Sequence, residues 1–168
     1  MKHIKFGDLE YNIPQGRLEI EQTYLQPMFS YCQEAVVILP KPINNVSEFR
    51  CHRKAKSIIQ KFFDELEQRG LLPALLTFNG CYDEKTTKAY PPKPSVQQWG
   101  IAFRLNMPYN EFCSNPPTVE PENDQFPAPG PKFWSGHPVV ELAQEMGFEW
   151  GGTKHISEPD LFQLCSDY

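Results

Sequence analysis

The sequence has no run of about eighteen apolar residues, which is the length that a membrane-spanning helix needs. It has no Cys-x-x-Cys pair, and its five cysteines are an odd number, so neither a disulfide framework nor a structural zinc knuckle is indicated. No apolar segment of the kind found in signal peptides follows the first eight residues. We therefore expect reduced thiols, no membrane partner, and cytoplasmic synthesis without a signal peptide.

An excess of basic residues is also missing. Lysine and arginine number 16 against 21 aspartates and glutamates, which gives a net charge of −5. Proteins that bind nucleic acid through its phosphates normally carry a basic face, so nucleic acid is not expected as a partner. The 168 residues are 40% hydrophobic, which is enough for one globular domain with a buried core.

Two helices are predicted from apolar periodicity. Between Ser47 and Arg69 the apolar side chains recur at helical spacing, with Asn45 or Ser47 as the expected N-cap and Gly70 as the expected end. A second helix is predicted for residues 138–146, where a proline suits the first turn.

Strands are predicted where short apolar runs end at turn residues. The β-branched run 35–39 ends at a proline, the run 73–78 ends at an Asn-Gly pair, and a third run spans 99–105. Together with the helices, these runs indicate an α+β fold in which a small antiparallel sheet packs against helices.

Prolines divide the chain unevenly. Residues 1–46 are irregular and punctuated by proline, and we interpret them as an N-terminal arm that packs on a core formed by residues 47–168. Within that core, segment 108–131 contains seven prolines and few periodic apolar residues. We expect it to be an extended loop, largely without helix or strand, that contacts another chain or the arm more than its own core.

Four segments carry more specific information, and they are 49–54 (FRCHRK), 76–82 (LTFNGCY), 95–106 (SVQQWGIAFRLN), and 147–152 (GFEWGG) with 158–164 (EPDLFQL). The third is similar to Ser-x-His-x-Trp-Gly-x-Ala-x-Asp-Leu-Asn, and the last to Gly-Phe-x-Trp-Gly-Gly with Asp-x-x-His-Phe-Gln. In this order they resemble the zinc D-alanyl-D-alanine carboxypeptidase and L-alanyl-D-glutamate endopeptidase family, in its phage endolysin-like branch. The resemblance covers roughly residues 45–168 and implies a carboxypeptidase-like peptidase core.

The resemblance also implies where a metal would lie. The family binds zinc through a His and an Asp of the central motif and a His of the closing motif, and a carboxylate three residues before that last His acts as general base. The three ligand positions here are Gln97, Arg104 and Leu161, while the base position keeps Glu158. Glutamine is a poor zinc ligand, leucine has no lone pair, and arginine brings a fixed positive charge. The resemblance thus implies vestigial metal positions, no bound metal or other cofactor, and no catalytic residue.

Three further residues are candidates for binding. Lys85 and Lys88 stand where the resemblance implies two basic residues that grip a substrate carboxylate, although lysine lacks the planar fork of arginine. Trp134 borders the proline-rich segment and is the best candidate for an exposed aromatic contact. No two of the four histidines stand at a ligand spacing such as i, i+4, which argues against a relocated zinc site.

The function implied is that of a pseudoenzyme. We expect a catalytically inactive peptidoglycan-peptidase-like domain with a structural or interaction role in a phage or prophage particle, where its partners are other protein chains and the virion is its destination. Two alternatives stay open: a module that binds peptidoglycan stem peptides, and a residual peptidoglycan endopeptidase or carboxypeptidase with an unrecognised metal arrangement.

One expectation concerns the arginine directly. The alternation of side chains along a strand aims Arg104 at the same cleft as the Asp that it replaces. A guanidinium taken out of water needs acceptors, and we expect Glu158 to be the first, Asp160 the second and the Gln97 amide oxygen a neutral third.

Overall fold

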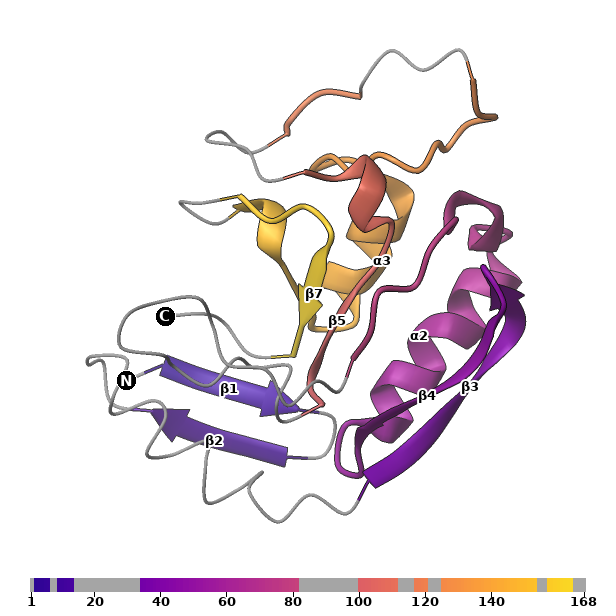
Figure 1. The fold of residues 1–168 in the computed structure, drawn as a ribbon. Coiled ribbons are helices and arrows are strands. Elements are labelled where there is room, and N and C mark those ends of the chain that lie inside the picture. The colour runs from indigo at the N-terminus through magenta and orange to yellow at the C-terminus, as the bar shows by residue number, and fades with distance from the viewer. Residues whose placement is uncertain are drawn as a thin grey trace, which may run out of the picture.

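The computed structural model describes residues 2–6, 9–13, 34–81, 100–111, 117–120, 125–153 and 157–164, and Figure 1 shows their arrangement. The strands are β1 (Lys2–Phe6), β2 (Leu9–Ile13), β3 (Glu34–Ile43), β4 (Val46–His52), β5 (Ala102–Arg104), β6 (Glu149–Trp150) and β7 (Leu161–Gln163). The helices are α2 (Lys56–Gln68) and α3 (Pro138–Glu145), with short 3₁₀ turns at Leu72–Ala74, Met107–Tyr109 and Gly151–Thr153. The mixed α+β class and the small antiparallel sheets are confirmed. Within the described residues, no helix has the length and apolar character of a membrane span.

A two-residue turn creates the β3–β4 hairpin. Asn44 and Asn45 have φ values of 45° and 67°, the left-handed values that a tight turn between twisted strands requires. The strand predicted at 35–39 is confirmed as part of β3, which pairs antiparallel with β4. The boundary predicted at residue 46 falls within this hairpin, at the start of β4. The side chains on one face of β3 are buried in the core.

The first half of the helix predicted between Ser47 and Arg69 is wrong. The turn folds residues 46–52 back onto β3, so α2 begins only at Lys56. Asn45 forms the turn instead of a cap, and the N-cap position is taken by Ala55, which makes no side-chain cap hydrogen bond. The predicted end is confirmed, because Gly70 follows the helix with a φ of 69°.

The strand predicted at 73–78 is also wrong. Pro73 has no N–H to give to a sheet, and it occupies the start of the 3₁₀ turn Leu72–Ala74 instead. Only Phe78 keeps strand-like pairing, as an isolated bridge to Leu105. The described part of the strand predicted at 99–105 is confirmed, since it contains β5.

The helix predicted at 138–146 is confirmed as α3. Pro138 occupies its first turn, and the Nδ1 atom of His137 accepts a hydrogen bond from the Val139 N–H over 3.1 Å. Because the Nε2 atom of His137 also lies 2.9 Å from the Gly130 carbonyl, this buried histidine fixes the start of the helix to the preceding segment.

The core lies between α2, α3 and one face of the sheet β5-β7-β6, whose strands are antiparallel (Figure 1). Phe103 and Phe162 are cross-strand partners with ring centroids 5.8 Å apart. Phe62 of α2 packs 5.7 Å from Phe103, and Phe148 packs 5.2 Å from Phe62. All four rings are buried, so this aromatic cluster joins the long helix to the sheet.

The described parts of the proline-rich loop contain no strand and no α-helix, as predicted, and only the turn Met107–Tyr109 at its start is regular. Their ends are bound to the core: the Pro131 carbonyl accepts hydrogen bonds from Asn106 and Asn110. The Pro117 carbonyl accepts another from the Ser135 N–H. Contact with another chain stays a prediction.

Candidate functional site

The candidate site lies on the face of the sheet opposite the aromatic cluster. Arg104 of β5 and Leu161 of β7 are directly opposite each other in the antiparallel register. Because side chains alternate along a strand, these two project from one face while Phe103 and Phe162 project from the other. Two of the three positions where the resemblance implies metal ligands are therefore neighbours, and the third, Gln97, lies outside the described residues.

Arg104 bridges two carboxylates. Its Nη1 atom donates to both oxygens of Asp160, at 2.8 and 2.9 Å, and its Nη2 atom donates to Oε1 of Glu158 at 2.7 Å. The side chains of Arg104 and Glu158 are 19% and 17% exposed, and that of Asp160 is 3% exposed. The expected ion pair with Glu158 is confirmed, and the second choice, Asp160, accepts at the same time through both of its carboxylate oxygens from a single guanidinium nitrogen.

A short turn holds both carboxylates in place. The Glu158 N–H donates to the Gly151 carbonyl at 2.9 Å, and the Asp160 carbonyl accepts from the Leu105 N–H at 2.9 Å. The indole N–H of Trp150 donates to the carbonyl of Pro159 at 2.7 Å. A Cβ at position 151 would collide with the Glu158 carbonyl, so glycine is needed for this close approach. The acids are thus fixed by backbone bonds as well as by the guanidinium.

Burial and charge act against each other in this cluster. Burial raises the pKa of Asp160, and the neighbouring Arg104 guanidinium opposes that rise. For Arg104, burial alone would lower the pKa, but the charges and hydrogen bonds of Asp160 and Glu158 outweigh it, so the pKa lies above its ordinary value. The guanidinium therefore stays charged, and it faces two acidic groups rather than one.

These residues do not fit the zinc that the resemblance implies. A cation already occupies the position between the two carboxylates, and the opposite partner, Leu161, offers no lone pair. Among the described residues, no group of three His, Cys, Asp or Glu side chains is placed to hold a metal ion.

Of the three binding candidates from the sequence, Lys85 and Lys88 are outside the described residues. Trp134 is only half-buried and lies between the proline-rich segment and α3. The Nδ1 atom of His52 accepts the Lys54 N–H at 3.0 Å, and burial, with the nearby Lys54 and Arg53 charges, lowers the pKa of His52 to about 4. This neutral histidine therefore stabilises the turn that follows β4.

Sequence reasoning missed a buried amide at the end of β5. Asn106 has a φ of 54°, and its Oδ1 atom accepts from the N–H groups of Leu76 and Thr77 at 2.7 and 3.0 Å. Its Nδ2 atom donates to the carbonyls of Ala74 and Pro131 at 2.7 and 3.0 Å. All its bonds are made within the protein, so it positions the segments around the site. An asparagine directly after a predicted strand was the available signal.

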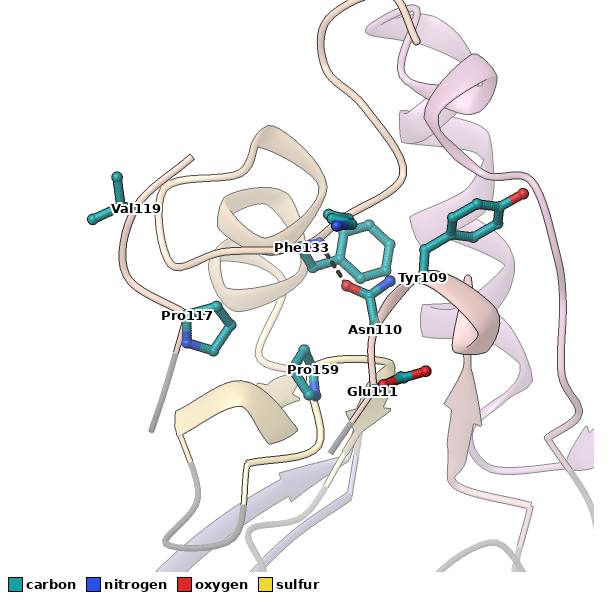
Figure 2. A pocket seen from close by; sticks show the side chains of 8 residues that line it. Tyr109, Asn110, Glu111, Pro117, Val119, Phe133 and Pro159 are labelled. Atoms are coloured by element: carbon teal, nitrogen blue, oxygen red, sulfur yellow. Dashed lines mark hydrogen bonds between the residues drawn. The ribbon is translucent and has the colours of Figure 1, made fainter. Parts of the chain in front are cut away.

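A pocket of about 140 Å³ lies beside the turn that carries the two acids (Figure 2). It is lined by Tyr109, Asn110, Glu111, Pro117, Val119, Lys132, Phe133 and Pro159. Asn110 accepts the Phe133 N–H at 2.7 Å, which fixes its wall, and Pro159 is the residue between the two carboxylates. No periodic pattern in the sequence predicted this pocket, because its lining residues come from separate loops.

Comparisons of the chain with models of protein families, with curated proteins and with solved structures find no match.

Proposed function

We propose that this chain is a catalytically inactive peptidase-like domain, on a carboxypeptidase-like core, with a structural or interaction role. The observation that carries the proposal is the fork of Arg104 onto Asp160 and Glu158, at the position where the resemblance implies a metal ligand. A zinc peptidase needs a metal-bound water and a carboxylate able to take its proton. Here the carboxylate at the base position is already bound to a guanidinium.

The geometry also supports the idea of a replaced metal site. Positions 104 and 161 are directly opposite on paired strands, and residue 158 lies on the adjoining turn. Side chains at these places can reach a common point, as ligands and a general base must. Arg104 then supplies the positive charge that joins β5 to the 158–160 turn, in place of a dication.

The interaction role follows from the loss of catalysis with retention of a folded core. We propose other protein chains as partners, in a phage or prophage particle, on the strength of the resemblance. Peptidoglycan stem peptides are the alternative ligand, and they serve as a probe below.

Restoring the implied ligand set tests the proposal. The variant Gln97→His/Arg104→Asp/Leu161→His should bind about one zinc per chain by elemental analysis after dialysis, whereas the unaltered chain should bind none. The matched control Arg104→Asp/Leu161→His lacks one ligand and should bind zinc much more weakly. Stoichiometric zinc in the unaltered chain would contradict the loss of the metal site.

Two further outcomes separate the parts of the proposal. A folded triple variant that binds no zinc would show that these positions do not form a vestigial metal site. Incubation of the unaltered chain with peptidoglycan stem peptides, with and without added zinc, should give no cleavage by mass spectrometry. Cleavage would instead support the alternative hypothesis of a residual peptidoglycan peptidase.

A further inference from the structure

One edge of the β3–β4 hairpin is closed by a side chain. The Oε1 atom of Gln60, on α2, accepts the Ile38 N–H at 2.9 Å, and its Nε2 atom donates to the Ile38 carbonyl at 2.7 Å. The same Nε2 atom also donates to Asp64 at 3.0 Å, which fixes the amide orientation. A carboxamide that bonds both groups of one residue does what the peptide group of a neighbouring strand would do.

The register shows which groups this edge presents. In an antiparallel pair, alternate residues point their N–H and C=O groups toward the partner strand and away from it. Ile38 points away from β4, toward Gln60, and its partner in register is Glu48. At the other end of the hairpin the His52 N–H points away from β3, to the Gly100 carbonyl at 2.9 Å. His52 pairs with Glu34 and Ile38 pairs with Glu48, and at both pairs the backbone groups point away from the partner strand. Val36 lies midway between Glu34 and Ile38, so its N–H and C=O groups also point away from β4.

The side chains at this edge are apolar and exposed. Val36 is 40% exposed and Ile38 is 63% exposed, and both lie on the outer face of the hairpin. In the part of the chain that the structure describes, β4 is the only strand that pairs with β3. An exposed, β-branched strand edge is the surface on which another strand adds.

We propose that Gln60 blocks the addition of a strand from a second copy of the chain at this edge. The edge is self-complementary: with a two-fold axis at Val36, the N–H and C=O groups of Val36 exchange two hydrogen bonds with those of the copy. The next pair in that register includes Ile38, whose groups Gln60 already holds. Pro40 and Pro42, which have no N–H, close the rest of the strand. Strand addition therefore requires Gln60 to release Ile38.

Removing the Gln60 amide tests this inference. In Gln60→Ala, the amide is lost from a half-buried position of α2 and replaced by a good helix former, so the fold should be retained by circular dichroism. Sedimentation velocity over a hundredfold concentration range should show that the variant dimerises at concentrations at least about tenfold lower than the unaltered chain. The control Gln68→Ala changes the same residue type at an exposed position of the same helix and should behave as the unaltered chain.

A second variant identifies the surface. Gln60→Ala/Val36→Lys places a lysine on the exposed edge and should return the protein to the association behaviour of the unaltered chain. If Gln60→Ala fails to fold, Gln60→Glu replaces it, since a carboxylate keeps the acceptor for the Ile38 N–H but has no donor for the carbonyl. Association equal to that of the unaltered chain, or association that Val36→Lys does not reverse, would overturn the inference.

Discussion

The two faces of the sheet β5-β7-β6 are stabilised by different kinds of interaction. On one face, the buried rings of Phe103 and Phe162 stack and pack against α2. On the other, one residue along in each strand, Arg104 bonds two carboxylates and Leu161 lies opposite it. Aromatic packing depends on area and shape and is insensitive to pH. The ion-pair face depends on having every charge matched, because an unmatched buried charge is costly.

This contrast predicts how each face fails. Truncating a ring leaves a cavity that the surrounding core fills only in part. Truncating the guanidinium removes the positive charge that both carboxylates bond. Both changes destabilise, but only the second makes stability depend on the protonation of acids.

Phe103→Ala is expected to have the largest effect. The ring is fully buried and lies within 6 Å of four other rings, those of Phe62, Phe63, Phe148 and Phe162. Its loss should lower the free energy of unfolding by about 3–5 kcal/mol, measured by urea denaturation. The more conservative Phe103→Leu should cost less, about 1–2 kcal/mol. An alanine variant within 1 kcal/mol of the unaltered chain would contradict this account of the core.

Arg104→Ala should lower the free energy of unfolding by about 2–3 kcal/mol. This is less than the roughly 3–5 kcal/mol expected for a fully buried pair, because Arg104 and Glu158 keep some contact with water. The matched control is Arg69→Ala, whose side chain is 47% exposed and pairs with Glu65 and Glu145 at 3.6 and 3.1 Å, and it should cost less than about 1 kcal/mol. Equal costs for the two arginines would show that the cluster behaves as an ordinary surface pair.

The cost of Arg104→Ala should also shrink in acid. Burial already raises the pKa of Asp160, and Arg104 opposes that rise, so the variant raises this pKa further. A carboxyl group with a raised folded-state pKa contributes stability that is present below the unfolded pKa of about 4 and is lost as the pH rises through the folded value. The difference between variant and unaltered chain should thus be smaller at pH 4.5 than at pH 7.5, by on the order of 1 kcal/mol. A difference independent of pH would rule out the ionised Asp160 carboxylate as the cause.

The sequence predicted those elements in which local pattern and tertiary contacts agree. Helix α3 carries its own signals, a proline in the first turn and a periodic apolar face, and the structure matches them. The helix prediction failed for residues 46–52 because their apolar spacing suits a helix as well as a strand. The Asn44-Asn45 turn, which returns the chain to β3, decided between the two. The turn was visible in the sequence as two asparagines between apolar runs.

For the candidate site, the sequence predicted the ion pair but not its full geometry. The resemblance put Arg104 and Glu158 at one implied site, strand alternation placed Arg104 on the correct face, and its charge required an acid nearby. That both Glu158 and Asp160 bind at once follows from the backbone turn between them, which depends on Gly151 and on the Leu105 N–H. The bonds of Arg104 and of the Leu105 N–H to this turn join segments more than fifty residues apart, and no pattern within one sequence reports them.

The smallest expected effect concerns a buried amide on the ion-pair face. Gln163 lies two residues beyond Leu161 in β7, is 1% exposed, and its Oε1 and Nε2 atoms have no hydrogen-bond partner in the part of the chain that the structure describes. A buried amide without partners is unfavourable, and methionine has a similar length without that cost. Gln163→Met should therefore raise the free energy of unfolding by about 0.5–1 kcal/mol, whereas the exposed control Gln144→Met should leave it unchanged. A loss of more than 1 kcal/mol would mean that this amide is bonded in the folded chain, and the ion-pair face would then extend along β7 as a continuous polar network rather than ending at Leu161.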